Sequence, residues 1–227
     1  MTNLQKRILT SFIILPSSVF FVIKGGWLLT FFLMFVLFAG LHEVYTSFKK
    51  EVSILFLSLI LSLAVASIYF LRSGEGAGHT LLYFAIAVCI SSDIGGYVFG
   101  KIFKWKKLTS ISPKKTISGV IGSYFFSLIC FVIFVEYHNS AFNLSITDAG
   151  YIEGAFFTII FSTIAQAGDL IISYFKRIEK IKDTGKILPG HGGIFDRIDG
   201  LIFVVIFAYL INYFNLHLKH HLCFFYV

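Results

Sequence analysis

The sequence predicts an all-α polytopic integral membrane protein with about seven transmembrane helices. Two observations support this prediction. Of the 227 residues, 57% are hydrophobic and only 14% are charged, with a mean hydropathy of +0.84, which leaves too little polar surface for a soluble domain of this size. In addition, apolar runs of about 15–20 residues recur along the whole chain, and each is long enough to cross a membrane as a helix.

Seven spans can be placed in order, because each apolar run is bounded by a short polar connection. They are residues 4–23, 27–47, 52–71, 81–100, 117–135, 151–175 and 198–214. The first run lacks the small-residue cleavage site of a secretory signal, so we expect it to remain as a span. We divide the chain into N-terminal helices (1–80), a catalytic transmembrane region (81–216) and a C-terminal tail (217–227).

The basic residues predict the orientation of the spans. With the N-terminus in the cytoplasm, 16 of the 19 Lys and Arg residues fall on the cytoplasmic side, while Lys24, Arg72 and Lys219 fall outside. This rule explains the net charge of +7 better than nucleic-acid binding does. The three cysteines are isolated, and they suggest neither a disulfide framework nor a metal cluster.

Four aspartates are predicted to gather in the cytoplasmic leaflet. Asp93 and Asp169 each lie seven or eight residues before the cytoplasmic end of their spans, which places them about 10 Å below it. Asp196 and Asp199 are three residues apart, share a helix face and open the last span from the same side. Ionisable groups inside a span are costly, so by default they indicate function.

A polar stripe runs down the sixth span. At about 100° per residue, spacings of three and four residues place its members on one helix face. The stripe consists of Gln166, Asp169, Ser173, Lys176 and Lys180. An ordinary membrane helix would be apolar at these positions.

A second polar cluster precedes the fifth span. Ser112, Lys114, Lys115 and Thr116 come just before the predicted helix start, and such a helix N-terminus with lysines favours phosphate. Helix capping by Ser or Thr, with lysines retained on the cytoplasmic side, explains the same residues equally well. The glycine-rich segment 91–97 permits either close helix packing or the close approach of a ligand.

Carboxylates without Cys or paired His suit a hard cation such as Mg²⁺, with room for a second cation. Two carboxylates from different helices, with cationic side chains nearby, could hold a triphosphate for in-line displacement. An internal network in which Lys176 and Arg197 neutralise Asp169 and Asp196 is the alternative. We expect Glu43 to be an interfacial or packing residue. The P-loop pattern is absent.

The stretch from Ser173 to Asp199 reads SYFKR, then KD, then LPGHGGIFDRID, and it resembles the signature of the phosphatidate cytidylyltransferase (CDP-diacylglycerol synthase) family. The segments 92–97 (SDIGGY) and 112–116 (SPKKT) are also similar to that family and stand in the same order. The resemblance covers at least residues 91–199. Many bacterial members have one or two more spans before this region, where only residues 52–71 stand here.

The resemblance implies a Mg²⁺-dependent membrane enzyme that joins CTP and phosphatidic acid into CDP-diacylglycerol and pyrophosphate. It also implies that the protein forms a homodimer. The expected location is a bacterial inner (plasma) membrane, in contact with membrane lipids. Its metal ligands would be Asp169 and Asp196, with Asp93 and Asp199 as further candidates, and Lys176 and Arg197 would lie near the transferred group. The expected phosphate-binding residues are Ser112, Lys114, Lys115, Thr116, Ser173, Arg177, His191, Gly192 and Gly193.

Two other functions stay open at this point. A CTP-dependent polyprenol or dolichol kinase would also transfer phosphate at a membrane face. A transporter would use intramembrane carboxylates as its pathway, but it would need them near the bilayer midplane rather than on one side. A CDP-alcohol phosphotransferase is disfavoured because its Asp-Gly-x-x-Ala-Arg pattern is absent.

Overall fold

The structure is a computed structural model that describes residues 14, 16–74, 78–109, 111–142, 148–185, 187 and 192–218. Six helices in this part of the chain are long and apolar enough to cross a membrane. They are α2 (Gly26–Ser47), α3 (Glu51–Ser73), α4 (Gly78–Phe103), α5 (Ile117–Phe142), α6 (Asp148–Ile178) and α7 (Phe195–Leu218). These helices confirm six predicted spans. The first predicted span lies mostly outside the described residues, of which 16–24 are helical.

Most helix ends differ from the predicted bounds by a few residues, and two of these differences affect the predicted site. The helix α6 ends at Ile178, so Lys180 does not continue the polar stripe. Lys180 adopts a left-handed conformation with φ 58°, and the N–H groups of Lys180 and Ile181 donate to the carbonyls of Arg177 and Lys176, both at 3.0 Å. This is the hydrogen-bond pattern of a Schellman motif, which satisfies carbonyls at a helix end. In turn, α7 begins at Phe195 rather than 198, so its first turn includes Asp196.

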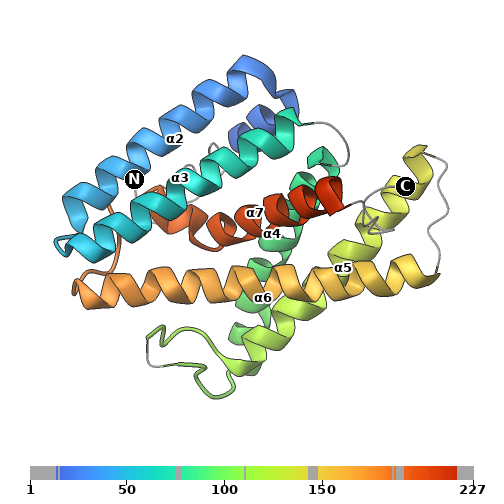
Figure 1. The fold of residues 1–227 in the computed structure, drawn as a ribbon. Helices are drawn as coiled ribbons and strands as arrows, with labels where there is room; N and C mark the ends of the chain where they lie inside the picture. Colours follow the sequence, from blue (N-terminus) through green and yellow to red (C-terminus); the bar gives the residue numbers. More distant parts are fainter. Residues whose placement is uncertain are drawn as a thin grey trace.

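Small residues let α4 and α5 approach closely where they cross (Figure 1). A Cβ atom added to Gly122 on α5 would lie 2.5 Å from the carbonyl oxygen of Gly95 on α4, which is closer than a real Cβ contact. Backbone therefore packs directly on backbone here. The packing interpretation of the glycines in segment 91–97 is thus correct for Gly95.

The connections gather at two opposite ends of the bundle, as the alternating spans predict. At one end, Arg72 at the end of α3 donates to the carbonyls of Val22 and Ile23, at 2.9 and 2.8 Å. The other end holds the α2–α3 corner, the α4–α5 loop and the α6–α7 loop. These connections contact one another, so the basic segments of the sequence meet on one side.

Glu179 joins two of these connections. Its carboxylate accepts hydrogen bonds from the backbone N–H of Lys50 at 3.0 Å, the N–H of Lys49 at 3.3 Å and the hydroxyl of Ser53 at 3.0 Å. Desolvation acts to raise the pKa of Glu179, but the hydrogen bonds from Lys50, Lys49 and Ser53 outweigh it and hold the pKa below its usual value. The end of α6 is thereby fixed to the start of α3.

Candidate functional site

The four aspartates come together from three helices, as the sequence predicts. Asp169 on α6 and Asp199 on α7 lie close enough for their carboxyl groups to interact electrostatically. Asp93 on α4 lies close enough to interact electrostatically with Asp169 and with Lys115. Because neighbouring carboxylates repel each other, this arrangement favours a proton or a cation beside them.

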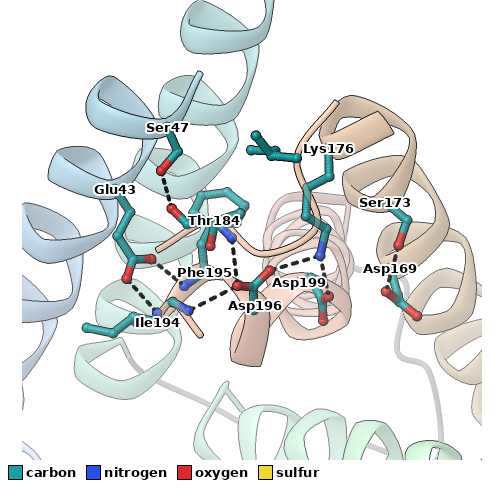
Figure 2. Close-up of polar contacts among 12 residues, drawn as sticks. Glu43, Ser47, Asp169, Ser173, Lys176, Thr184, Ile194, Phe195, Asp196 and Asp199 are labelled. Carbon is teal, nitrogen blue, oxygen red and sulfur yellow. Dashed lines mark hydrogen bonds and ion pairs between the residues drawn. The ribbon is translucent and has the colours of Figure 1, made fainter. Parts of the chain in front are cut away.

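Two lysines supply positive charge to the cluster. The ammonium group of Lys176, on a side chain only 10% exposed, lies 2.9 Å from Oδ1 of Asp196 and 4.0 Å from Oδ2 of Asp199 (Figure 2). Lys115, from the α4–α5 loop, lies 2.6 Å from Oδ2 of Asp169 and donates to the carbonyl of Gln166 at 3.1 Å. The structure therefore contains part of the neutralising network that the sequence allowed, with Lys115 beside Asp169.

Asp196 organises the loop before α7. Its Oδ2 accepts hydrogen bonds from the backbone N–H of Thr184 at 2.8 Å and of Gly193 at 3.0 Å, while Oδ1 accepts from Lys176 (Figure 2). Both oxygens are thus occupied by donors of the chain itself. A cation at Asp196 would therefore have to replace Lys176 at Oδ1.

Glu43 is a residue of this site that sequence reasoning missed. It is 1% exposed, so the packing interpretation is correct, but its role goes beyond packing. Its two carboxylate oxygens accept hydrogen bonds from the backbone N–H of Ile194 at 2.8 Å and of Phe195 at 3.0 Å (Figure 2). Glu43 on α2 therefore caps the N-terminus of α7, where a negative charge is favourable.

Glycines let the α6–α7 loop approach this carboxylate. A Cβ atom on Gly185 would lie 2.7 Å from Oε1 of Glu43, and one on Gly193 would also collide with the Glu43 carboxylate. Gly192, at φ 87°, has no room for a Cβ because Oδ2 of Asp196 lies 2.9 Å from that position. The predicted role of Gly192 and Gly193 in binding phosphate stays a prediction, since in this structure they pack around Glu43 and Asp196. His191 lies outside the described residues.

The residues of the second polar cluster, which precedes α5, take different positions. Thr116 is the N-cap of α5, because its hydroxyl accepts a hydrogen bond from the N–H of Gly119 at 3.1 Å. The carbonyl of Ser112 accepts from the N–H of Lys115 at 3.0 Å and closes a turn. Lys114 is exposed on that turn, whereas Lys115 reaches Asp169. Capping is therefore confirmed for Thr116, and Lys115 is the residue of this cluster that contacts an aspartate.

Three further predicted residues surround the cluster. The hydroxyl of Ser173 donates to Oδ1 of Asp169 at 3.4 Å (Figure 2). Arg177 donates to the carbonyls of Ile111 and Ile181 at 3.4 and 3.1 Å, so it joins the α4–α5 loop to the α6–α7 loop. Arg197 lines a cavity together with Asp93 and Asp199.

The donor set fits a hard cation. In the described part of the chain, no three His, Cys, Asp or Glu side chains converge closely enough to form a protein-only metal site. Mg²⁺ does not require one, because it usually binds one or two carboxylates and completes its shell with water and substrate phosphates. The neighbouring carboxylates of Asp169 and Asp199 could supply such a pair.

Comparison with known proteins agrees with this geometry. A sequence model described as the cytidylyltransferase family matches residues 47–214, which include every element of the site except Glu43. Two relatives named phosphatidate cytidylyltransferase align over nearly their whole length. The protein of Rickettsia bellii is 34% identical over 225 residues, which are 93% of this chain and 91% of the relative. That of Rickettsia conorii is 31% identical over 220 residues, 93% and 92% of the two chains.

A relative from Staphylococcus haemolyticus with the same name is 40% identical over 142 residues, 62% of this chain and 52% of that protein. The chain thus spans about half the length of the staphylococcal relatives it matches, and nearly the full length of the rickettsial ones. The matched region contains the aspartate cluster, the α4–α5 loop that supplies Lys115 and the helix α6 that supplies Lys176. The chain belongs to the cytidylyltransferase family.

Proposed function

We propose that this chain is a phosphatidate cytidylyltransferase, which converts CTP and phosphatidate into CDP-diacylglycerol and pyrophosphate. One observation carries the proposal: aspartates from α4, α6 and α7 meet Lys115 and Lys176 at one end of a membrane bundle. This end combines access for a water-soluble triphosphate with proximity to a lipid headgroup. The names of the relatives support the same reaction.

The reaction is a displacement at the α-phosphorus of CTP. An anionic oxygen of the phosphatidate phosphate forms a bond to this phosphorus, and the bond to the oxygen that bridges to the β-phosphate breaks. Pyrophosphate leaves with the electron pair. Because the attacking oxygen is already an anion, neither a protein nucleophile nor a general base is needed. Catalysis then depends on positioning and on charge stabilisation.

The lysines of the site perform this stabilisation. Lys176 and Lys115 hold their ammonium groups beside carboxylates, so each can turn to donate to a phosphate oxygen without leaving the site. Arg197, which lines the cavity together with Asp93 and Asp199, would supply a further positive charge for the lipid phosphate. Asp196, held by Thr184 and Gly193, keeps Lys176 in place until the nucleotide arrives.

Mg²⁺ is the cofactor that we propose for this site. Asp169 and Asp199 would hold it, with Asp93 beside them and with Asp196 as a ligand once Lys176 turns to the nucleotide. Bound there, the ion would offset the charge of the triphosphate.

We further propose that the end with the basic loops faces the cytoplasm of a bacterial inner membrane, and that the chain forms a homodimer. The charge distribution supports the orientation. Cysteine labelling from either side of sealed vesicles would test the orientation, and chemical crosslinking in the membrane would test the dimer.

A radiolabel assay tests the activity. Purified protein in detergent is incubated with phosphatidate, Mg²⁺ and CTP labelled in its cytidine. The proposal predicts lipid-extractable label that EDTA abolishes and excess Mg²⁺ restores. Folded protein that yields no lipid label would refute the proposed reaction.

A further inference from the structure

The end of α4 and the residues that follow it form an exposed segment, residues 101–108, that mixes large apolar side chains with lysines. The apolar members are exposed by about half, at 65% for Ile102, 51% for Phe103, 53% for Trp105 and 38% for Leu108. The four remaining residues are exposed lysines, at 101, 104, 106 and 107. No Asp or Glu stands between residues 93 and 136 in the sequence, so no acidic neighbour along the chain offsets this charge.

The length of α4 carries this segment into the headgroup layer. The helix has 26 residues, or about 39 Å, whereas the hydrocarbon core of a bilayer is about 30 Å thick. Asp93 lies ten residues before Phe103, about 15 Å from the end of the helix. Lys104 then adopts a left-handed conformation with φ 50°, and the ring of Trp105 follows at 6.4 Å from that of Phe103. The apolar rings therefore lie together near the level where acyl chains meet headgroups.

Backbone hydrogen bonds hold the segment in place beside the site. The N–H of Leu108 donates to the carbonyl of Lys115 at 2.8 Å, and the N–H of Ile117 donates to the carbonyl of Lys106 at 3.0 Å. These bonds use main-chain groups only, and they leave the side chains of residues 101–108 exposed. Because Lys115 contacts the aspartate cluster, the segment is fixed to an element of the site rather than placed on a separate loop.

We propose that residues 101–108 bind the anionic phospholipid surface of the membrane. The lysines contact lipid phosphates, and the apolar side chains lie among the first carbons of the acyl chains. Trp is enriched at membrane interfaces, and lysines next to a membrane attract anionic lipids. Lysines on an open surface recognise charge rather than one headgroup, so the occupant is the bulk anionic phospholipid. This binding is separate from any lipid held at the aspartates, and it does not depend on the proposed reaction.

A second copy of the chain matches this surface less well. In a twofold dimer the same patch of both copies meets at the axis, so the lysines of residues 101–108 would face identical lysines of the partner. Like charges placed together in this way repel each other, whereas anionic lipid neutralises them. Charge complementarity therefore favours the lipid surface as the occupant.

The tryptophans of the chain provide a direct test, because the only two are Trp27 and Trp105. Trp27→Phe protein is placed in phosphatidylcholine nanodiscs that contain the same small fraction of either brominated phosphatidylglycerol or brominated phosphatidylcholine. Bromine on the acyl chain quenches the fluorescence of Trp105 on contact. Neither phosphatidate nor CTP is present, so the result is independent of turnover. The proposal predicts quenching by brominated phosphatidylglycerol at least about twofold stronger, since each lysine at the surface favours anionic lipid.

Two matched variants in the Trp27→Phe background locate the effect. Lys106→Gln with Lys107→Gln should remove most of the difference between the two lipids. Lys49→Gln with Lys50→Gln removes the same charge from exposed residues of the α2–α3 corner and should keep the difference. If the first variant does not fold, about 0.5 M salt decides instead, because it screens exposed lysines and should reduce the difference. Equal quenching of Trp27→Phe protein by the two lipids would overturn the proposal. Absence of quenching by either lipid would also overturn it and would leave a second copy of the chain as the occupant.

Discussion

Removing the Glu43 carboxylate should loosen the start of α7 and thereby disturb the aspartate cluster. Glu43→Gln keeps the shape of the side chain, but it places an amide NH₂ against one of the two backbone N–H donors. One charge-assisted hydrogen bond is lost, which costs about 1.5–3 kcal/mol. Glu43→Ala leaves the N–H groups of Ile194 and Phe195 both unsatisfied, at about 1–3 kcal/mol each, and adds a cavity.

The assay is hydrogen exchange by mass spectrometry on peptides that contain Ile194 and Phe195, together with thermal unfolding in detergent. In Glu43→Gln these two amides should exchange faster, while amides in the middle of α3 keep their protection. Turnover should also fall in this variant, because displacing a catalytic group by about 1 Å can lower the rate about 10²-fold. Glu51→Gln, an exposed glutamate in the first turn of α3, is the control. Wild-type protection of both amides in Glu43→Gln would refute the capping role.

Four other predictions follow from particular contacts. Asp169→Asn should fold normally and lose about 10²-fold or more in turnover, and near-normal turnover would contradict its place in the reaction. Lys115→Ala should lower turnover more than Lys114→Ala, and equal effects would argue against the Lys115–Asp169 contact. Gly122→Ala should lower the free energy of unfolding by about 1–3 kcal/mol, measured by denaturant unfolding, because its Cβ meets backbone. Glu179 has a lowered folded-state pKa, so its stabilisation relative to Glu179→Gln is present above the unfolded value of about 4.5 and disappears as the pH falls through the folded value. As the pH falls through that range, the melting temperatures of the wild type and of Glu179→Gln should converge. A difference that stays constant with pH would contradict the stabilising role of the Glu179 carboxylate.

The helices and the positions of the aspartates along them could be predicted from the sequence for a physical reason. A chain in lipid must satisfy its backbone hydrogen bonds within each span, so long apolar runs are helices. Helical periodicity then fixes where residues such as Asp169 and Ser173 lie along a span. The same reasoning predicts that Asp199 lies near Asp169. Both residues lie close to the helix ends that are predicted to meet the same side of the membrane.

Contacts between distant segments could not be predicted in this way. The backbone donors that Glu43 accepts from are 151 and 152 residues away in the sequence, and nothing near Glu43 marks them. The position of Lys115 beside Asp169 depends on how a loop folds back over the bundle. Helical periodicity alone includes Lys180 in the polar stripe, because periodicity does not predict where a helix ends. In the structure, Lys180 is a left-handed residue just after the end of α6.

Following each phosphate of CTP tests the central claim most directly. Two parallel reactions with phosphatidate and Mg²⁺ use CTP labelled at the α-phosphate or at the γ-phosphate. A cytidylyltransferase transfers the α-label to lipid and releases the γ-label as water-soluble pyrophosphate. The account predicts this pattern in wild-type protein and its loss in Asp169→Asn. Lipid that carries the γ-label instead would show a kinase and contradict the account.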